Sequence, residues 1–138
     1  MGLVGIELPN EKRSVVSLKE VIENSAFQKH PSKLAMALGK NINGEYVITD
    51  LARMPHLLIA GQTGSGKSVG MNGFLISLLY KNSPRDLRMI MIDPKRVELD
   101  AYNGIPHLLC PVINDSEKAL NALKWSVAEM LRRYDILK

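Results

Sequence analysis

The residues whose types and spacing indicate chemistry most clearly lie between positions 61 and 68. In order they are Gly61, Gln62, Thr63, Gly64, Ser65, Gly66, Lys67 and Ser68, and they match the pattern G-x-x-x-x-G-K-[ST] at every fixed position. Glycine allows the backbone to turn tightly there and to approach a polyphosphate that a Cβ atom would keep away. Successive backbone N–H groups can then surround one anion. The pattern therefore predicts a phosphate-binding loop, or P-loop.

Lys67 and Ser68 are the residues of this loop that we expect to act on a bound nucleotide. A helix that begins near Lys67 would direct the positive end of its dipole toward the phosphates. Lys67 is expected to contact the β- and γ-phosphates, and the Ser68 hydroxyl is expected to ligate Mg²⁺. ATP and Mg²⁺ are therefore the predicted ligands, with Lys67 as the catalytic residue and Ser68 as the metal ligand.

The segments on either side of the loop predict the elements that hold it. Residues 57–60 are a short apolar run of the kind that forms a buried parallel strand, and residues 69–80 have the apolar spacing of an amphipathic helix. Residues 88–93 predict a second buried strand, which ends in the carboxylate of Asp93. A strand, a helix and a strand at this spacing predict a right-handed βαβ unit. The expected fold class is therefore α/β, a P-loop fold with a parallel sheet flanked by helices.

Smaller elements are predicted before the P-loop. Residues 5–10 have the pattern of a strand end that runs into a turn. Ser17 and Glu20 have the spacing of a capping box, which predicts a short helix over residues 18–28. The pair Asn43-Gly44 predicts a β-hairpin with a two-residue loop, in which residue 40 pairs with residue 47.

The chain is expected to contain parts of two structural domains. Residues 1–32 hold one helix and a strand end, too few elements to bury a core, so we assign them to the end of an upstream α/β subdomain. Residues 33–138 are assigned to the first half of a P-loop ATPase domain, beginning with the hairpin. A start signal at residues 114–117 precedes a long apolar stripe at helical spacing, and no C-cap follows before Lys138. We therefore expect this domain to be truncated.

Composition restricts the class of protein without choosing a function. The chain has 138 residues, a net charge of +4 and a pI near 9.3, which permit a polyanionic partner without requiring one. No apolar run approaches the roughly 20 residues of a membrane helix, and the single cysteine, Cys110, cannot form an internal disulfide. His30, His56 and His107 lack the spacing of metal ligands. No Ser-His-Asp set or pair of carboxylates indicates hydrolytic chemistry other than on a nucleotide.

Several blocks of the sequence resemble the motor domain of the FtsK/SpoIIIE double-stranded DNA translocases. The blocks are Met54–Gly61 running into Thr63–Gly70, then Met91–Lys95, Glu98-Leu99, Gly104–Leu109 and Met130–Tyr134. The resemblance begins at Gly5-Ile6-Glu7 with Pro9-Asn10 and covers nearly the whole chain. Together these blocks are far more specific than a P-loop alone.

This resemblance implies a RecA-like motor that assembles as a homo-hexamer around double-stranded DNA and moves the DNA using ATP. The implied setting is chromosome segregation and cell division, in a cytoplasmic domain whose parent protein is anchored at the membrane by a segment absent from this sequence. Residues 33–138 would then form the first half of the RecA-like domain. The DNA-contacting loops and the C-terminal winged-helix DNA reader of the family have no match here.

Asp93 is a candidate for the acid that works with Mg²⁺, because it ends an apolar strand after the P-loop. The resemblance argues against this role, since the acid of the family lies further downstream, after four apolar residues, in an Asp-Glu pair that this chain lacks. The alternative is that Asp93 to Arg96 shape the crevice at the carboxyl end of the sheet. We therefore leave Asp93 out of the predicted catalytic residues.

The basic pairs Lys95-Arg96 and Arg132-Arg133 could contact DNA or a neighbouring subunit, although exposed basic pairs are usually solvated.

Three functions remain open on this sequence. The first is the ATP-binding part of a double-stranded DNA translocase. The second is a P-loop motor of conjugation or secretion, which moves protein or single strands. The third is a non-catalytic nucleotide-binding fragment, because the hydrolytic acid and the DNA-tracking loops have no match. We expect this chain alone to have negligible ATPase activity.

Overall fold

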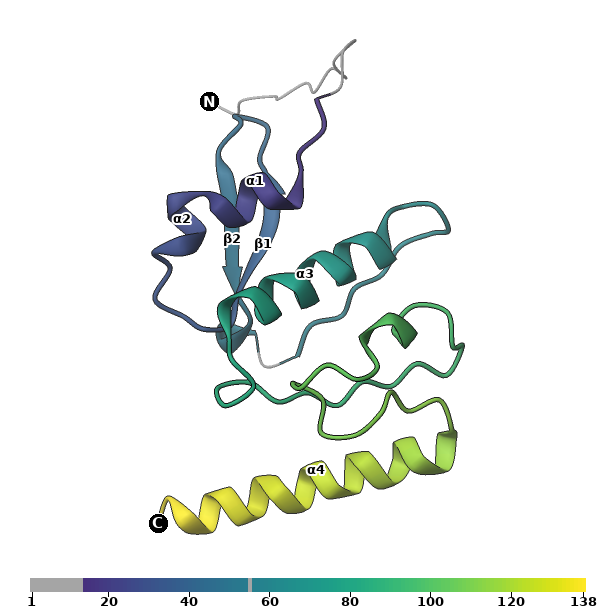
Figure 1. Ribbon diagram of the computed structural model, residues 1–138. Coiled ribbons are helices and arrows are strands. Elements are labelled where there is room, and N and C mark those ends of the chain that lie inside the picture. The colour runs from purple at the N-terminus through teal and green to yellow at the C-terminus, as the bar shows by residue number, and fades with distance from the viewer. Residues whose placement is uncertain (1–13, 55) are drawn as a thin grey trace, which may run out of the picture. The chain divides into compact units, whose positions relative to one another are not determined.

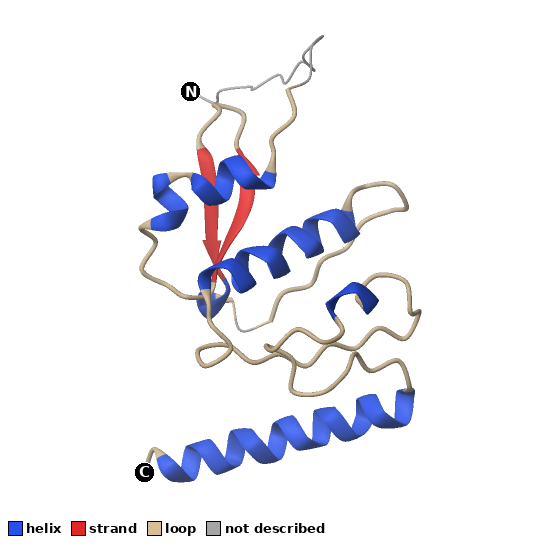
Figure 2. Ribbon diagram, in the orientation of Figure 1, coloured by secondary structure: helices blue, strands red, loops and turns tan. Residues whose placement is uncertain are grey.

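The computed structural model of the protein describes residues 14–54 and 56–138. The chain divides into two compact units, residues 1–58 and residues 59–138. Figure 1 follows the chain through both units, and Figure 2 separates helices from strands. The predicted strand end at residues 5–10 lies outside the described residues. The units divide after the hairpin, whereas the predicted domain boundary after residue 32 falls before it, and that assignment of domains stays a prediction.

The first unit begins with two short helices, α1 (Leu18–Glu23) and α2 (Ser25–Gln28). The Ser17 hydroxyl accepts the backbone N–H of Glu20 at 3.2 Å, and the Glu20 carboxylate interacts in turn with the Ser17 backbone. This reciprocal arrangement confirms the predicted capping box. Asn24 divides the single helix that the sequence predicts, because its extended backbone ends α1 while its side chain caps α2.

A hairpin follows, in which β1 (Ala35–Lys40) pairs antiparallel with β2 (Tyr46–Asp50). The hairpin confirms the prediction, but the predicted register is wrong by one residue. Lys40 pairs with Tyr46 rather than with Val47, and the register shifts again within β1, next to Gly39. A slip of this kind changes which side chains share a face, so it had to be established from the structure.

The loop of the hairpin explains the difference in register. Asn41 closes a loop that is longer than two residues, because its backbone N–H donates to the carbonyl of Glu45 at 2.9 Å. The side-chain oxygen of Asn41 accepts the backbone N–H groups of Asn43 and Glu45, each at 2.9 Å. Gly44 adopts a φ of 79°, the left-handed conformation that glycine tolerates. The Asn-Gly pair therefore marks the turn, while the side chain of Asn41 sets the length of the loop.

The helices and the hairpin of this unit share one small core, in which Phe27 is 1% exposed. The buried members are Val21, Ile22, Phe27, Ala35 and Ala37, and Leu18, Tyr46 and Ile48 pack against them. At its edge the Glu20 carboxylate accepts the Tyr46 hydroxyl at 2.8 Å and pairs with Lys40. β2 then leads into the 3-10 helix η1 (Leu51–Arg53).

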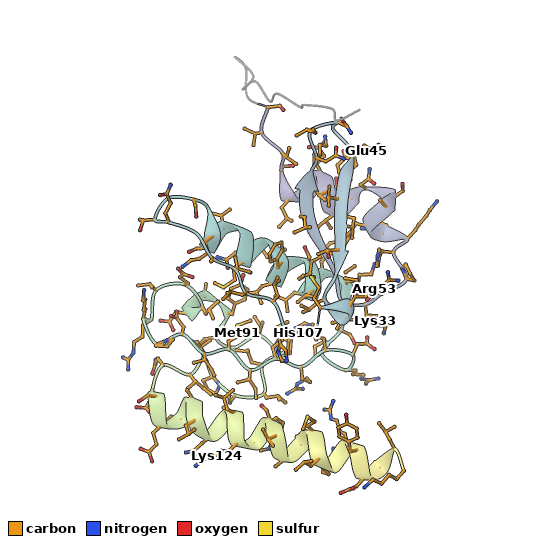
Figure 3. The ribbon with its side chains drawn as sticks, turned by 180° about the vertical axis from the view of Figure 1, so that it is seen from behind. Lys33, Glu45, Arg53, Met91, His107 and Lys124 are labelled. Atoms are coloured by element: carbon orange, nitrogen blue, oxygen red, sulfur yellow. The ribbon has the colours of Figure 1, made fainter. Side chains whose placement is uncertain are left out.

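The second unit is built from α3 (Lys67–Lys81) and two extended segments that follow it, residues 89–93 and 107–113. These segments run parallel, with isolated bridges between Met89 and Leu108 and between Ile92 and Ile113. The backbone N–H of Met89 donates to the carbonyl of His107 at 2.8 Å, and that of Asp93 donates to Ile113, also at 2.8 Å. Figure 3 shows Met91 and His107 on these neighbouring segments. The 3-10 helix η2 (Asp100–Tyr102) lies between them in sequence.

The predicted parallel sheet is wrong in its extent. Within the described residues the only named sheet is the antiparallel pair β1-β2. Residues 57–60 form no strand, and Leu58 is 90% exposed rather than buried. A strand exists only where a neighbour supplies its hydrogen bonds, and an apolar run cannot specify that neighbour. The predicted strand at residues 88–93 is present only as an extended segment, and it pairs in parallel with residues 107–113 through isolated bridges.

α3 packs on these segments through its apolar side. Met91, Leu99 and Val112 form the buried centre, and Met71 and Leu75 of α3 pack against it. The other residues packed there are Met89, Tyr102 and Leu108. This core fixes the start of α3 relative to the segment that follows Asp93.

The last helix, α4 (Ser116–Ile136), begins where the sequence predicts, because the Asp115 carboxylate accepts the backbone N–H of Lys118 at 2.9 Å. None of its residues is buried, although its apolar stripe includes Leu123, which is 58% exposed.

Ion pairs with Arg132 and then Arg133 lower the pKa of Glu129 on α4 to about 2. Among the helices that the structure describes, α4 included, none combines the length and apolar character needed to span a bilayer.

Candidate nucleotide-binding site

The predicted P-loop forms an open turn that leads directly into α3. Gly66 is the N-cap of the helix, with a φ of 85°, and Gly64 has a φ of 82°. Both values lie in the left-handed region, where a Cβ atom would be strained. The backbone N–H of Ser65 donates to the carbonyl of Gln62 at 3.1 Å, which closes the turn. The glycines of the motif are therefore required by the backbone conformation itself.

Gly61, the first fixed glycine of the motif, is required by a close approach. A Cβ atom at this position would lie 2.3 Å from the Oγ of Ser65. Such a distance is far below van der Waals contact, so any other residue here would require the Ser65 side chain to move. The conformation of the loop thus accounts for glycine at positions 61, 64 and 66.

The start of α3 is left open to an anion. Gly66 has no side chain to offer, and the structure shows no side-chain hydrogen bond that caps the helix. The first backbone N–H groups of a helix have no partner within the helix, and they carry its positive end. The Lys67 side chain is exposed beside them. Backbone and side chain together favour a phosphate at this position.

A hollow of about 370 Å³ lies over the loop. Its lining includes all of the predicted site residues except Ser65, namely Gly61, Gln62, Thr63, Gly64, Gly66, Lys67 and Ser68, together with Val69 and Glu98. The sequence-based prediction did not include Glu98. Glu98-Leu99 is one of the blocks that resemble the family, but no local pattern places Glu98 in the site, because it reaches the hollow from a segment 30 residues away from Ser68.

Glu98 contacts the predicted metal ligand directly. The Ser68 hydroxyl donates to the Glu98 carboxylate, with an Oγ–Oε1 distance of 2.6 Å. One further hydrogen bond joins the same elements, because the Tyr102 hydroxyl donates to the Asn72 side-chain oxygen of α3 at 2.6 Å. Within α3 the Asn72 amide donates to the Ser68 carbonyl at 3.0 Å. The segment after Asp93 is therefore fixed beside the first turns of α3.

Asp93 organises that segment from within. Its carboxylate is 7% exposed and accepts four backbone N–H groups, those of Lys95, Val97, Glu98 and Leu99, at 3.2, 3.1, 2.9 and 3.0 Å. These bonds, above all those from Glu98 and Leu99, lower the pKa of Asp93 below its ordinary range. The turn they enclose holds Arg96 at a φ of 57°, which is rare for a residue other than glycine. Asp93 is thus directed into its own loop, and it does not line the hollow.

The oxygen atoms at the hollow fit a small divalent cation. Mg²⁺ prefers oxygen ligands and is usually held by one or two protein groups together with substrate phosphates. The Ser68 hydroxyl and the Glu98 carboxylate supply such oxygens. Among the described residues no cluster of three His, Cys, Asp or Glu side chains could hold a metal unaided. A cation here would therefore depend on the phosphates for most of its ligands.

Comparison with known proteins identifies the chain. The model of the FtsK/SpoIIIE family matches residues 17–138, which include every element of the site. The chain belongs to the FtsK/SpoIIIE family.

The relatives found within this family carry the name DNA translocase. The chain is 58% identical over 134 residues to DNA translocase FtsK of Pseudomonas aeruginosa, a match that covers 97% of this chain and 16% of the relative. It is 59% identical over 133 residues to DNA translocase FtsK of Caldanaerobacter subterraneus, which covers 96% of this chain and 19% of the relative. The chain therefore spans less than a fifth of the length of these FtsK/SpoIIIE proteins.

The other candidate residues of the sequence lie away from the hollow. Lys95 and Arg96 are exposed, and Arg96 donates to the Asn114 side chain at 3.2 Å. Arg132 and Arg133 both pair with Glu129 on α4, each at 2.7 Å. The structure does not bring either basic pair to the P-loop.

The histidines and the cysteine show no common site. His107 Nε2 lies 3.0 Å from the carbonyl of Asn82, and His30 Nδ1 accepts the backbone N–H of Ser32 at 3.2 Å. His56 is exposed, and Cys110 is a half-buried free thiol.

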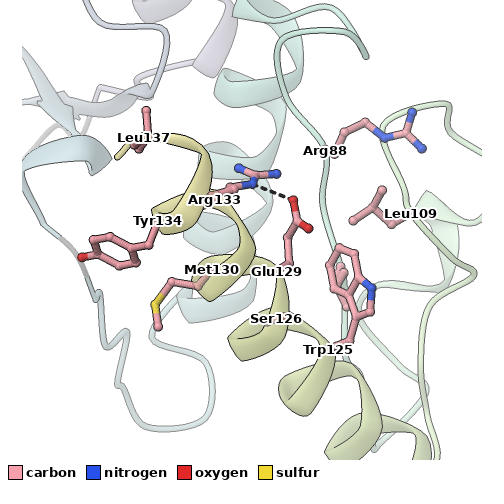
Figure 4. A pocket seen from close by; sticks show the side chains of 10 residues that line it. Arg88, Leu109, Trp125, Ser126, Glu129, Met130, Arg133, Tyr134 and Leu137 are labelled. Carbon is pink, nitrogen blue, oxygen red and sulfur yellow. Dashed lines mark hydrogen bonds and ion pairs between the residues drawn. The ribbon is translucent and has the colours of Figure 1, made fainter.

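A second hollow, of about 490 Å³, lies between α4 and the segments that contain Arg88 and Leu109. Figure 4 shows the Glu129 carboxylate directed at Arg133 on the same helix, and Trp125 lying beside Leu109. The glutamate in this hollow is already neutralised by its two arginines. Nothing in its lining offers the uncapped amides that distinguish the P-loop.

The hydrogen bonds of Asp93 predict that the free energy of unfolding of the second unit falls at acid pH. Because the folded-state pKa of Asp93 lies below its ordinary value of 3.8, its carboxylate contributes stability that is complete above that value. This contribution is lost as the pH falls through the lower, folded-state value. We expect Asp93→Asn to destabilise the second unit at pH 7, because an amide NH₂ would face donors, and the difference from the wild type to shrink below about pH 4.

Unfolding followed by Trp125, the single tryptophan, measures the second unit alone. Asp135→Asn is the matched control, because Asp135 is 73% exposed and pairs with Lys138 only on the surface. Equal stability of the Asp93→Asn variant and the wild type at pH 7 would contradict the assigned role.

Proposed function

We propose that residues 61–68 bind ATP together with Mg²⁺, and that the chain is the nucleotide-binding part of a double-stranded DNA translocase. The observation that carries the proposal is the uncapped start of α3, where Gly66 leaves the first amides open beside Lys67 and Ser68. Membership of the FtsK/SpoIIIE family supports it independently of that geometry. The two lines of support meet on the same residues.

Each residue of the loop has a separate task in this proposal. The amides at the start of α3 donate to the phosphates, while the turn closed by Ser65 and Gln62 keeps those amides directed at one point. Lys67 places a positive charge against the β- and γ-phosphates, where negative charge accumulates in phosphoryl transfer. The Ser68 hydroxyl is the metal ligand. Bound Mg²⁺ would neutralise part of the phosphate charge.

The wider activity of the parent protein is proposed from the relatives. Those found here are named DNA translocases, and this chain matches less than a fifth of their length. We assign to the whole protein a homo-hexameric motor that moves double-stranded DNA in chromosome segregation and cell division. Its motor would be cytoplasmic, in a protein anchored at the membrane. Residues 1–32 would end an upstream subdomain, and residues 33–138 would begin a RecA-like domain.

A second candidate is a chain that binds nucleotide without hydrolysing it. The contacts of Asp93 favour this candidate, because the carboxylate is occupied by four backbone N–H groups and does not reach the hollow. On either candidate the isolated chain has negligible ATPase activity. Turnover by the isolated chain that Lys67→Ala abolishes would return a carboxylate of this chain to the catalytic residues.

Lys67→Ala is expected to weaken the binding of Mg-ATP by at least about tenfold, because a charge-assisted hydrogen bond to phosphate contributes roughly 1.5–3 kcal/mol. The measurement is a fluorescence titration of the 138-residue chain with mant-ATP. Lys124→Ala is the matched control, because this exposed lysine lies on α4 and does not line the hollow. Equal affinity of the wild type and Lys67→Ala would contradict binding at the P-loop.

A chimera tests the translocase assignment. The matching 134 residues of the Pseudomonas aeruginosa relative are replaced by this chain, at 58% identity. We expect ATPase activity that double-stranded DNA stimulates and that Lys67→Ala in the inserted segment abolishes. The unmodified relative serves as the positive control. Stimulation by single strands or peptide in place of duplex DNA would favour a conjugation or secretion motor and overturn the assignment.

A further inference from the structure

Glu98 contributes the one carboxylate in the lining of the hollow over the P-loop. It is half-buried, and its contact in the hollow is the hydrogen bond from the Ser68 hydroxyl at 2.6 Å. The other residues of the lining are glycines, neutral side chains and Lys67. A negative charge placed among groups that favour an anion requires a reason, because it opposes the binding of phosphate on its own.

The position of Glu98 is determined by its neighbours. Its backbone N–H donates to the buried Asp93 carboxylate at 2.9 Å, and the next residue, Leu99, is 9% exposed in the core of the second unit. The hydroxyl of Tyr102, four residues after Glu98, donates a hydrogen bond to the side-chain oxygen of Asn72 on α3 at 2.6 Å. The Glu98 carboxylate therefore contacts Ser68 from a segment that hydrogen bonds and core packing hold in place.

The direction of the hydrogen bond has a consequence for metal binding. A serine hydroxyl has one proton and two lone pairs. When the proton of Ser68 is donated to Glu98, both lone pairs remain available to a cation. The negative charge of the carboxylate, next to the hydroxyl, further favours a cation there. Groups that hold a metal ligand in this way strongly affect metal affinity.

We propose that Glu98 is a positioning residue that makes nucleotide binding depend on Mg²⁺, by orienting the Ser68 hydroxyl and by opposing phosphates that arrive without a cation. The inference rests on the proposed binding of ATP at residues 61–68. Its signature is a pair of opposite effects. Removal of the charge weakens the binding of Mg-ATP, and it leaves unchanged or strengthens the binding of metal-free ATP.

The experiment measures the affinity of the 138-residue chain for mant-ATP in excess Mg²⁺ and again in excess EDTA. For Glu98→Gln we expect the ratio of the two affinities to fall about tenfold, the size expected for a hydrogen bond to a charged group. Glu117→Gln is the matched control, with the same change of charge at an exposed position on α4, and its ratio should equal that of the wild type. In a Ser68→Ala background, Glu98→Gln should lower the ratio much less, because the two residues act together.

Three results would overturn the inference. Unchanged affinities of Glu98→Gln in both Mg²⁺ and EDTA would show that the carboxylate does not act on the metal. An equal loss of affinity in Mg²⁺ and in EDTA would show a structural role only, and circular dichroism of the variant would reveal whether it has lost its fold. Failure of the wild type to bind mant-ATP in either condition would overturn the proposed function itself, whereas the first two results leave that function intact.

Discussion

The backbone N–H groups at the start of α3 lack a side-chain cap, because glycine occupies the N-cap. Helices normally satisfy these groups with a Ser, Thr, Asp or Asn side chain, and the helices α1, α2 and α4 of this chain do so. At the start of α3 no side chain caps the helix. The left-handed glycines at positions 64 and 66, and the close packing of Gly61 on Ser65, keep that place clear. This geometry supports the proposed binding of an anion at the loop.

A second layer of contacts holds the side chains of the candidate site in place. The Asp93 carboxylate accepts hydrogen bonds from four backbone N–H groups. The turn that these bonds hold places the Glu98 carboxylate next to the Ser68 hydroxyl. The Asp93 carboxylate therefore has a structural role, whereas the Glu98 carboxylate lines the hollow. The hydrogen bond between Tyr102 and Asn72 ties the same segment to α3 a turn further along. The hydrogen bonds that satisfy these backbone N–H groups and the proposed orientation of Ser68 as a metal ligand therefore depend on the same segment.

The sequence predicts best what is decided locally. The start of α3 at Lys67, the capping box and the start of α4 depend on residues a few positions apart, and all three are present in the structure. The register of the hairpin was mispredicted because the Asn41 side chain closes the loop. The strand at residues 57–60 was mispredicted because strands require neighbours distant in sequence. Glu98 was missed for a similar reason, since its contact with Ser68 spans 30 residues. Asp93 was ambiguous, because an acid after an apolar run can face either a ligand or its own loop.

The most direct test of the central claim is an amide NMR titration of the 138-residue chain with Mg-ATP. The account predicts that the amide resonances of residues 61–68 shift as a group and saturate, while those of the hairpin over residues 35–50 stay unchanged. The same titration of Lys67→Ala should leave the loop resonances in place at equal concentrations. If the wild type is folded and the amides of residues 61–68 do not move at any concentration of Mg-ATP, the P-loop of this chain is not a nucleotide site.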